Sequence, residues 1–174
     1  ALYNPDTKVE GLMAVNANTI AVTNRYSGPA LPPGFTFSAL LQVWPTLNGQ
    51  FQIGLHEGGL FTYPGAQVLS TTGGRTIYSP FTAAAAVPLN AKRCQGNISI
   101  QNNLTGANSY GGFGGVGGIG AVNVSSNPAS SAGGGAQTPY PLIPLTSPQT
   151  LYYILQASGG VATLTVNVTG YTIF

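Results

Sequence analysis

The last part of the chain shows a regular alternation of apolar and polar residues. Apolar side chains occupy every second position of 162–168, and Thr or Asn stands between them. A two-residue period is typical of a β-strand with one buried face and one solvated face. After Gly170 the apolar positions shift by one residue, to Tyr171 and Ile173. A shift of this kind at a glycine predicts a β-bulge that turns the strand.

Further strands are predicted elsewhere along the chain. Apolar residues recur with a two-residue period in 35–43, 51–55 and 97–101, so we expect strands with one buried face there. Segment 151–155 is apolar throughout, which predicts a strand covered on both faces. The buried faces that we expect in the alternating segments are Phe35, Phe37, Ala39, Leu41 and Val43; Phe51, Ile53 and Leu55; and Ile98 and Ile100. The remaining candidate strands are 12–23, 60–63, 67–71, 75–79 and part of 116–124.

Helix signals are poor by comparison. The chain contains 25 Gly and 13 Pro, which recur too often for long helices. The best helical candidate is Thr82–Val87, and Pro88 would end it after about one turn. Roughly eight to ten short strands separated by Pro and Gly turns predict an all-β sandwich or barrel. The length of 174 residues suits one domain, so we expect a single sandwich over 1–174.

One long segment, 106–135, departs from the strand pattern because 11 of its 30 residues are glycine. We predict a loop here, and a loop of this length inside a compact domain is usually functional or mobile. Large side chains are set between the glycines, and they would be poorly solvated if the loop stayed free. We therefore expect the loop to order against something such as a neighbouring subunit, the alternative being a flexible surface loop. The assembly-interface candidates in it are Tyr110, Phe113, Val116 and Ile119.

The N-terminal arm, residues 1–10, admits the same two interpretations. It contains Leu2 and Tyr3, which we add to the assembly-interface candidates. Two histories fit Ala1: removal of an initiator Met, or cleavage of a secretory signal.

The charge of the chain is low and unevenly distributed. Lys, Arg, Asp and Glu make up 5% of the residues, against about 25% in an ordinary soluble domain. The 81 residues of 94–174 carry no formal charge. Five dispersed basic residues make no patch for phosphate contacts, so direct nucleic-acid binding is not expected. A hydrophobic share of 43% is enough for a real core, which argues against disorder.

Sequence motifs for cofactors or metals are weak. The segments 112–117 and 115–120 match G-x-G-x-x-G, but no helical pattern follows and no acid lies beyond Glu57. A dinucleotide site needs both features, so composition alone explains the match. Asp6, Glu10 and Glu57 show no spacing suited to Ca²⁺ or to paired carboxylates. We predict no cofactor and no metal.

One catalytic arrangement is conceivable, a Cys94 nucleophile paired with His56. Lys92 and Arg93 could lower the pKa of the thiol. The competing interpretation is a structural Cys94 and a solvated His56 at the end of a strand. The second interpretation is favoured because the spacing is long and no acid is placed to orient the imidazole. We therefore predict no catalytic residues and no enzyme.

The low charge and the aromatic content of the chain indicate instead that it assembles with other molecules. A soluble monomer normally keeps charge on its surface to resist association, and this chain has little. Interface cores are depleted in charge and enriched in aromatic residues, and the chain has nine Tyr and seven Phe. Neutral faces rich in Thr and Asn also cost less to bury than unpaired charges. We infer a β-protein whose surface is largely covered by copies of itself or by partners.

A family resemblance rests on four features of the chain: the short strands, the Gly-rich segment, the apolar start, and the Pro-rich corners at 29–33 and 139–144. The chain resembles viral capsid proteins of the single jelly-roll type, and more narrowly the smaller major capsid protein of tailless, icosahedral, internal-membrane phages of Thermus. The resemblance implies an antiparallel eight-stranded jelly-roll sandwich (a single β-barrel) with two four-stranded sheets. It also implies a place in the virion, packing in a capsid lattice, a larger partner capsid protein, an internal lipid membrane beneath the shell, and no catalysis. The absence of a basic N-terminal arm agrees with a membrane lying between shell and genome.

Two further function classes stay open from the sequence. The first is a secreted β-sandwich binding module, a lectin or adhesin whose aromatic residues line a sugar site. The second is a pilus or surface-layer subunit, which shares the same physical features as a viral shell protein.

Overall fold

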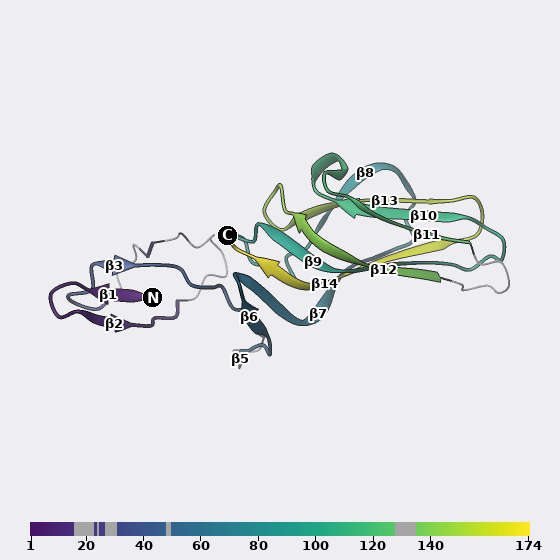
Figure 1. The fold of residues 1–174 in the computed structure, drawn as a ribbon. Coiled ribbons are helices and arrows are strands. Elements are labelled where there is room, and N and C mark those ends of the chain that lie inside the picture. Colours follow the sequence, from purple (N-terminus) through teal and green to yellow (C-terminus); the bar gives the residue numbers. More distant parts are fainter. Residues whose placement is uncertain (16–22, 24, 27–30, 48–49, 128–134) are drawn as a thin grey trace.

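The structure is a computed structural model that describes residues 1–15, 23, 25–26, 31–47, 50–127 and 135–174. Within these residues the chain is almost entirely β, and every strand pair is antiparallel (Figure 1). The prediction of an all-β sandwich is therefore confirmed. The first strands are β1 (Leu2–Asn4), β2 (Val9–Gly11), β3 (Phe37–Ser38), β4 (Thr46–Leu47), β5 (Gln50–Phe51) and β6 (Leu55–Glu57). The remaining elements are β7 (Leu60–Thr71), β8 (Arg75–Thr82), β9 (Arg93–Asn102), β10 (Ser109–Gly114), the 3-10 turn η1 (Val116–Gly118), β11 (Val122–Ser126), β12 (Gly135–Pro144), β13 (Thr150–Ala157) and β14 (Ala162–Thr172).

Two sheets form the body of the molecule. One has the strand order β12-β9-β14-β7-β6, and the other has the order β11-β10-β13-β8. The pairings are nested: β7 pairs with β14, β8 with β13, β9 with β12, and β10 with β11. The first half of this region thus folds back on the second half strand by strand. The two sheets remain separate, so of the two predicted architectures, sandwich or barrel, the body is an open sandwich.

The alternating segment 162–168 lies in β14, the central strand of the five-stranded sheet. In β14 the apolar positions of 162–168 are buried, and the Thr and Asn positions between them are only half-buried. The pairing of β14 with β9 shifts register between Val168 and Gly170, and Tyr171 and Ile173 are buried beyond it. The predicted bulge at Gly170 is confirmed, as are the buried positions Ile98 and Ile100 in β9.

The Gly-rich segment is not the long loop that we predicted. Its described part contains β10 and β11, which make one half of the four-stranded sheet, with the 3-10 turn η1 between them. The reason lies in the approach of the two sheets: a Cβ built on Gly111 would lie 2.6 Å from the Leu164 Cδ1 atom of the facing sheet. Phe113 is fully buried in the core of the sandwich. The structure therefore gives Phe113 a packing role and removes it from the exposed interface candidates.

Several other expectations are corrected. In 151–155 the exposure alternates, with Leu151, Tyr153 and Leu155 buried and the two residues between them half-buried, so the strand is fully covered on one face only. Thr82–Val87 contains a single hydrogen-bonded turn, in which Val87 N donates to Ala83 O at 3.1 Å, and no α-helix. Of 12–23, residues 12–15 form no strand and 16–22 lie outside the described residues.

The N-terminal arm is part of a separate three-stranded sheet, of order β2-β1-β3, which projects from one end of the sandwich (Figure 1). The chain between β3 and β7 carries the small antiparallel β4–β5 pair and β6, the edge strand of the five-stranded sheet, and we call residues 40–47 and 50–57 the junction. The Trp44 ring packs edge-on against Phe61 in the core, with ring centroids 4.6 Å apart. No helix among the described residues has the length and hydrophobicity needed to span a membrane.

Candidate functional site

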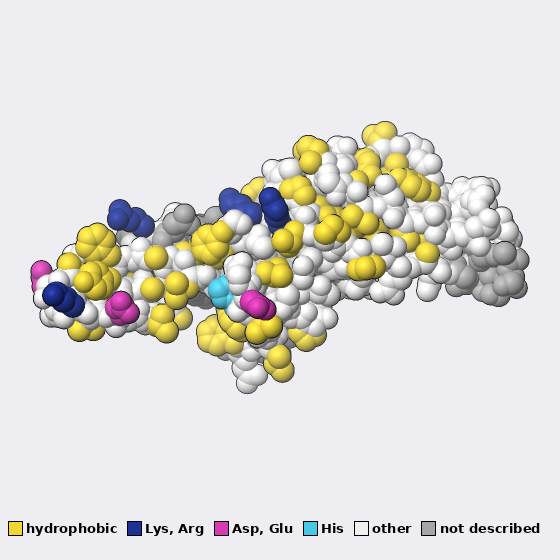
Figure 2. Space-filling view, in the orientation of Figure 1, with side chains coloured by type: hydrophobic (Ala, Val, Ile, Leu, Met, Phe, Trp, Pro, Cys, Tyr) yellow, Lys and Arg dark blue, Asp and Glu magenta, His cyan; other side chains and the backbone are white. Residues whose placement is uncertain are grey.

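Many of the exposed apolar side chains of the described residues lie on the N-terminal sheet and the junction, although Ile77 of the sandwich is also highly exposed. In the space-filling view, hydrophobic side chains cover much of this half of the molecule (Figure 2). The charged side chains seen in this view lie on the same half and at the adjoining end of the sandwich, while the rest of this face of the sandwich shows none. The candidate site is therefore an interaction surface with apolar and charged groups, attached to a body whose few strand charges, at Glu57, Arg75 and Arg93, stand at strand ends.

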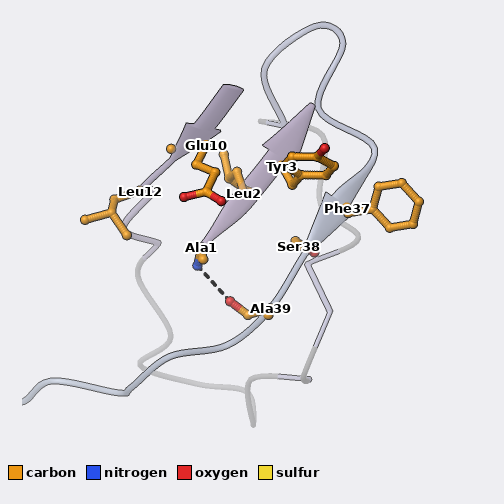
Figure 3. Close-up of a pocket in the computed structure, with 9 residues that line it drawn as sticks. Ala1, Leu2, Tyr3, Glu10, Leu12, Phe37, Ser38 and Ala39 are labelled. Atoms are coloured by element: carbon orange, nitrogen blue, oxygen red, sulfur yellow. Dashed lines mark hydrogen bonds between the residues drawn. The ribbon is translucent and has the colours of Figure 1, made fainter. Parts of the chain in front are cut away.

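One face of the N-terminal sheet forms a shallow groove, which we call the arm groove. Strand pairing sets Tyr3 between Glu10 and Phe37, so these three side chains share a face. The rings of Tyr3 and Phe37 lie 6.4 Å apart at a tilt of 47°. The groove has a volume of about 490 Å³, and Leu12 borders it on the side away from the rings (Figure 3). Glu10 is the one carboxylate that lines it.

The junction is the second part of the surface. Phe51, Ile53 and Leu55 are 68, 85 and 61% exposed, although their alternation with polar residues predicted a buried face. The prediction was wrong because no layer of the described chain lies over these residues. The same holds for Phe37 and Leu41, which the alternation in 35–43 also placed on a buried face and which are exposed. Only two residues of that segment, Phe37 and Ser38, form a strand.

The predicted interface residues do not form one patch. Leu2 is buried within the N-terminal sheet, while its neighbour Tyr3 is exposed in the arm groove. Tyr110 lies at the start of β10, and Val116 and Ile119 lie past its end, all three exposed. A six-residue strand spans about 20 Å, so these residues occupy opposite ends of the β10–β11 hairpin.

Sequence reasoning missed Leu12, Phe51, Ile53 and Leu55 as interface candidates. The signal that could have found the last three is the alternation of 51–55, which we assigned to the core of this chain. A period-two pattern predicts that a face is covered, but it does not say whether the cover belongs to the same chain.

The conceivable catalytic pair is not assembled. Cys94 pairs with Tyr171 across strands, Tyr171 with Phe61, and Phe61 with His56. The two residues thus stand in one row but three inter-strand spacings apart, about 14 Å. The Phe61 and Tyr171 rings, with centroids 5.4 Å apart, fill the space between them. His56 and Glu57 are exposed at the end of β6, as the structural interpretation expected.

The Cys94 thiol and three tyrosine side chains are packed in or against the core of the sandwich. Burial raises the pKa of the Cys94 thiol to about 12, which keeps it protonated and unreactive at neutral pH. Burial also raises the pKa values of Tyr63, Tyr140 and Tyr171. The Tyr140 hydroxyl donates to the Asn167 carbonyl at 2.8 Å, and the Tyr63 hydroxyl donates to the Ala86 carbonyl at 2.8 Å. These groups hold the sandwich together.

The residues considered for cofactor or metal binding form no such site in the described parts of the chain. The first G-x-G-x-x-G match, 112–117, ends β10 and enters η1, and a strand follows in place of the helix that a dinucleotide site requires. No group of three or more His, Cys, Asp or Glu is placed to hold a metal ion among the residues described.

Comparison with known proteins found no matching family model, no matching curated protein and no matching solved structure.

Proposed function

We propose that the chain is a structural subunit of an icosahedral viral capsid, which associates with copies of itself and with a second capsid protein through uncharged and apolar surfaces. The observation that carries this proposal is the exposure of Phe37, Phe51, Ile53 and Leu55. Their sequence pattern is that of a covered strand face, and nothing in the described chain covers them. Exposed apolar patches of this kind mark interaction surfaces.

The nested strand pairing supports a finer fold assignment, the eight-stranded jelly roll. In a jelly roll a long antiparallel ribbon of eight strands folds over into two four-stranded sheets. The strands β7 to β14 pair in this way, and β6 adds a further strand at the edge of one sheet. Jelly rolls are frequent in viral capsid proteins and in lectins, so a jelly roll is compatible with both functions and does not distinguish between them.

The outer face of the five-stranded sheet also suits a covered position. Along β14 it presents Thr163 and Thr165, and the Asn167 side chain donates to the Asn97 side-chain oxygen at 2.9 Å. Here the Asn167 amide is paired within the face, and no residue from Thr163 to Thr169 carries a charge that would be costly to desolvate; the charged residues of this sheet, Glu57 and Arg93, stand at one end of it. A neighbouring subunit can therefore pack here at low cost.

The proposal places the chain in the virion shell. The larger capsid protein is the expected second partner, and contact with an internal lipid membrane fits the apolar junction. Direct binding to nucleic acid is not part of the proposal, because the chain has only five basic residues.

Sedimentation velocity over a range of concentrations tests the association. Phe37→Ser removes an apolar group from the arm groove, and Val161→Ser is a matched control because the two side chains are 48 and 49% exposed. We expect the sedimentation coefficient of the native chain and of V161S to rise with concentration, and that of F37S to rise less. A native chain that stays monomeric throughout, alone and with other shell components of its source, would contradict the proposal and favour the binding-module alternative.

A further inference from the structure

A second, polar groove lies across three neighbouring strand ends of the four-stranded sheet, and we call it the amide groove. Strand register sets Tyr110 of β10 opposite Ser125 of β11 on one side and opposite Gln156 of β13 on the other. Paired residues of adjacent strands share a face, so these three side chains form one row. The groove has a volume of about 490 Å³.

A second row extends the groove beyond the strand ends. It contains Asn108 and Ser158, and Asn127 borders the groove after β11. The Asn108 N–H donates to the Ser158 hydroxyl oxygen at 2.9 Å, and the Ser158 N–H donates to the Asn108 carbonyl at 2.9 Å. These two bonds fix the backbone on which the Asn108 side chain is carried.

The polar side chains of the first row are available for a ligand. Within the described part of the chain, the side chains of Tyr110, Ser125 and Gln156 make no hydrogen bond. Together they offer two hydroxyl groups and one amide, which both donate and accept. Tyr110 is 38% exposed, so part of its ring is open to contact as well.

A glycine next to Tyr110 is covered by a neighbouring side-chain amide. Gly112 lies two residues further along β10 and therefore on the same face of the sheet. A Cβ at Gly112 would lie 2.2 Å from the Asn123 side-chain oxygen, so the Asn123 amide occupies the space that a larger residue would need. The Asn123 amide thus covers this glycine, and neither Gly112 nor Asn123 lines the groove.

We propose that the amide groove binds a neutral saccharide. Neutral sugars present many hydroxyl groups together with apolar C–H faces, which match side-chain amides and hydroxyls beside an aromatic ring. The residues lining the groove carry no charge, and the whole segment 94–174 has none, so the lining itself offers no cation to pair with an acidic sugar or a phosphate. A purely apolar ligand would leave the polar row unpaired.

This inference does not rest on the capsid proposal. The amide groove lies at the end of the sandwich away from the N-terminal sheet, so the two surfaces can be occupied independently (Figure 1). Subunits that cover the arm groove and the junction therefore do not need to contact the amide groove.

The test is binding of the full chain to an array of neutral oligosaccharides that also holds their sialylated and sulfated counterparts. Titration calorimetry with the best neutral oligosaccharide then compares the native chain with Tyr110→Ala, Gln156→Ala and Tyr3→Ala. Tyr3 is a matched control because it is 37% exposed and lies in the arm groove. We expect affinity to fall at least about tenfold for Y110A and Q156A and to be unchanged for Y3A.

Three results would overturn the inference. They are no binding to any neutral oligosaccharide, a preference for the sialylated or sulfated counterparts, and equal affinity in Y110A, Q156A and the native chain. A thermal unfolding curve for each variant identifies any that has lost its fold. If Y110A unfolds, Tyr110→Phe replaces it and is expected to bind with intermediate affinity, whereas native affinity in both Y110F and Q156A would overturn the inference. Sedimentation of the same samples reports assembly separately, so failure of sugar binding and failure of the capsid proposal are distinguishable.

Discussion

The Tyr171 hydroxyl donates a hydrogen bond to the Val43 backbone carbonyl, with the two oxygens 2.6 Å apart. Tyr171 is fully buried in the last strand of the sandwich, and Val43 lies in the junction, 128 residues earlier in the chain. Beside Val43, Trp44 packs on Phe61, and its indole N–H donates to the Gln52 carbonyl at 2.8 Å. The core of the sandwich therefore holds the chain segment from which the N-terminal sheet projects.

Loss of this hydroxyl is predicted to weaken the anchor. Tyr171→Phe keeps the ring but leaves the Val43 carbonyl without its donor, which we expect to lower the free energy of unfolding by about 1–2 kcal/mol. Chemical denaturation measures the change. Tyr152→Phe is the control, because Tyr152 is half-buried in β13 and its hydroxyl bonds to no described residue. Equal unfolding midpoints for the two variants would contradict the anchoring role.

The glycine at position 111 is predicted to be needed for the close approach of the two sheets. Gly111→Val would push side-chain atoms into Leu164 and Ile100, and we expect a loss of about 1–3 kcal/mol in unfolding free energy. Gly74→Val is the matched comparison, since the nearest atom to a Cβ at Gly74, the Leu155 carbonyl oxygen, lies at an ordinary 3.6 Å. Thermal unfolding of both variants decides the point, and a G111V protein as stable as G74V would show that the sheets do not meet there.

Two isoleucines that both stand in alternating patterns are predicted to respond differently to truncation. Ile98→Ala removes packing from a fully buried site and should cost about 2–5 kcal/mol of unfolding free energy. Ile53→Ala affects an exposed side chain, and the isolated subunit should change by less than about 0.5 kcal/mol. Self-association measured on the same samples should fall for I53A. A large loss of subunit stability in I53A would mean that the chain covers Ile53 itself.

The Cys94 thiol is predicted to be inert in the folded chain. Burial raises its pKa from the ordinary 9.0 to about 12, and only the thiolate reacts with disulfide reagents. At pH 8 a colorimetric thiol reagent should therefore label the native chain far more slowly than the chain in denaturant. Rapid native labelling at the unfolded rate would contradict the buried position.

Alkaline pH is predicted to destabilise the fold. The folded chain keeps Cys94 protonated to about pH 12, whereas the unfolded chain loses this proton near pH 9, so the unfolded state binds fewer protons between the two values. Stability is therefore complete below pH 9 and falls as pH rises, by at most about 1.4 kcal/mol per pH unit for each such group. The raised pKa values of Tyr63, Tyr140 and Tyr171 act in the same direction. Denaturation midpoints measured from pH 8 upward test the slope, and a flat profile would contradict it.

The sequence correctly predicted the strands whose apolar face is covered by other strands of the same chain. In 162–173 and 97–101 the alternation gave the correct faces and even the bulge at Gly170, because the residues that bury these side chains belong to the same sandwich. The charge-free half of the chain was likewise evident from composition alone.

The remaining errors have two physical causes. The glycines of β10 led us to predict a loop, but in the structure they allow the two sheets to approach each other. Glycine is used both in loops and at close contacts between sheets, and only the side chain that faces it in the other sheet distinguishes the two cases. The junction was interpreted as core because a periodic pattern does not identify the molecule that covers it. The amide groove had no sequence signal, since its row of Ser125, Tyr110 and Gln156 exists only through strand register.

The capsid proposal is tested most directly by electron microscopy of the native source with gold-labelled antibodies raised against this chain. The account predicts gold on closed icosahedral particles, in a regular distribution over the shell. Gold found on free protein, on the cell surface or on filaments, with closed particles unlabelled after mild disruption of the shell, would contradict it.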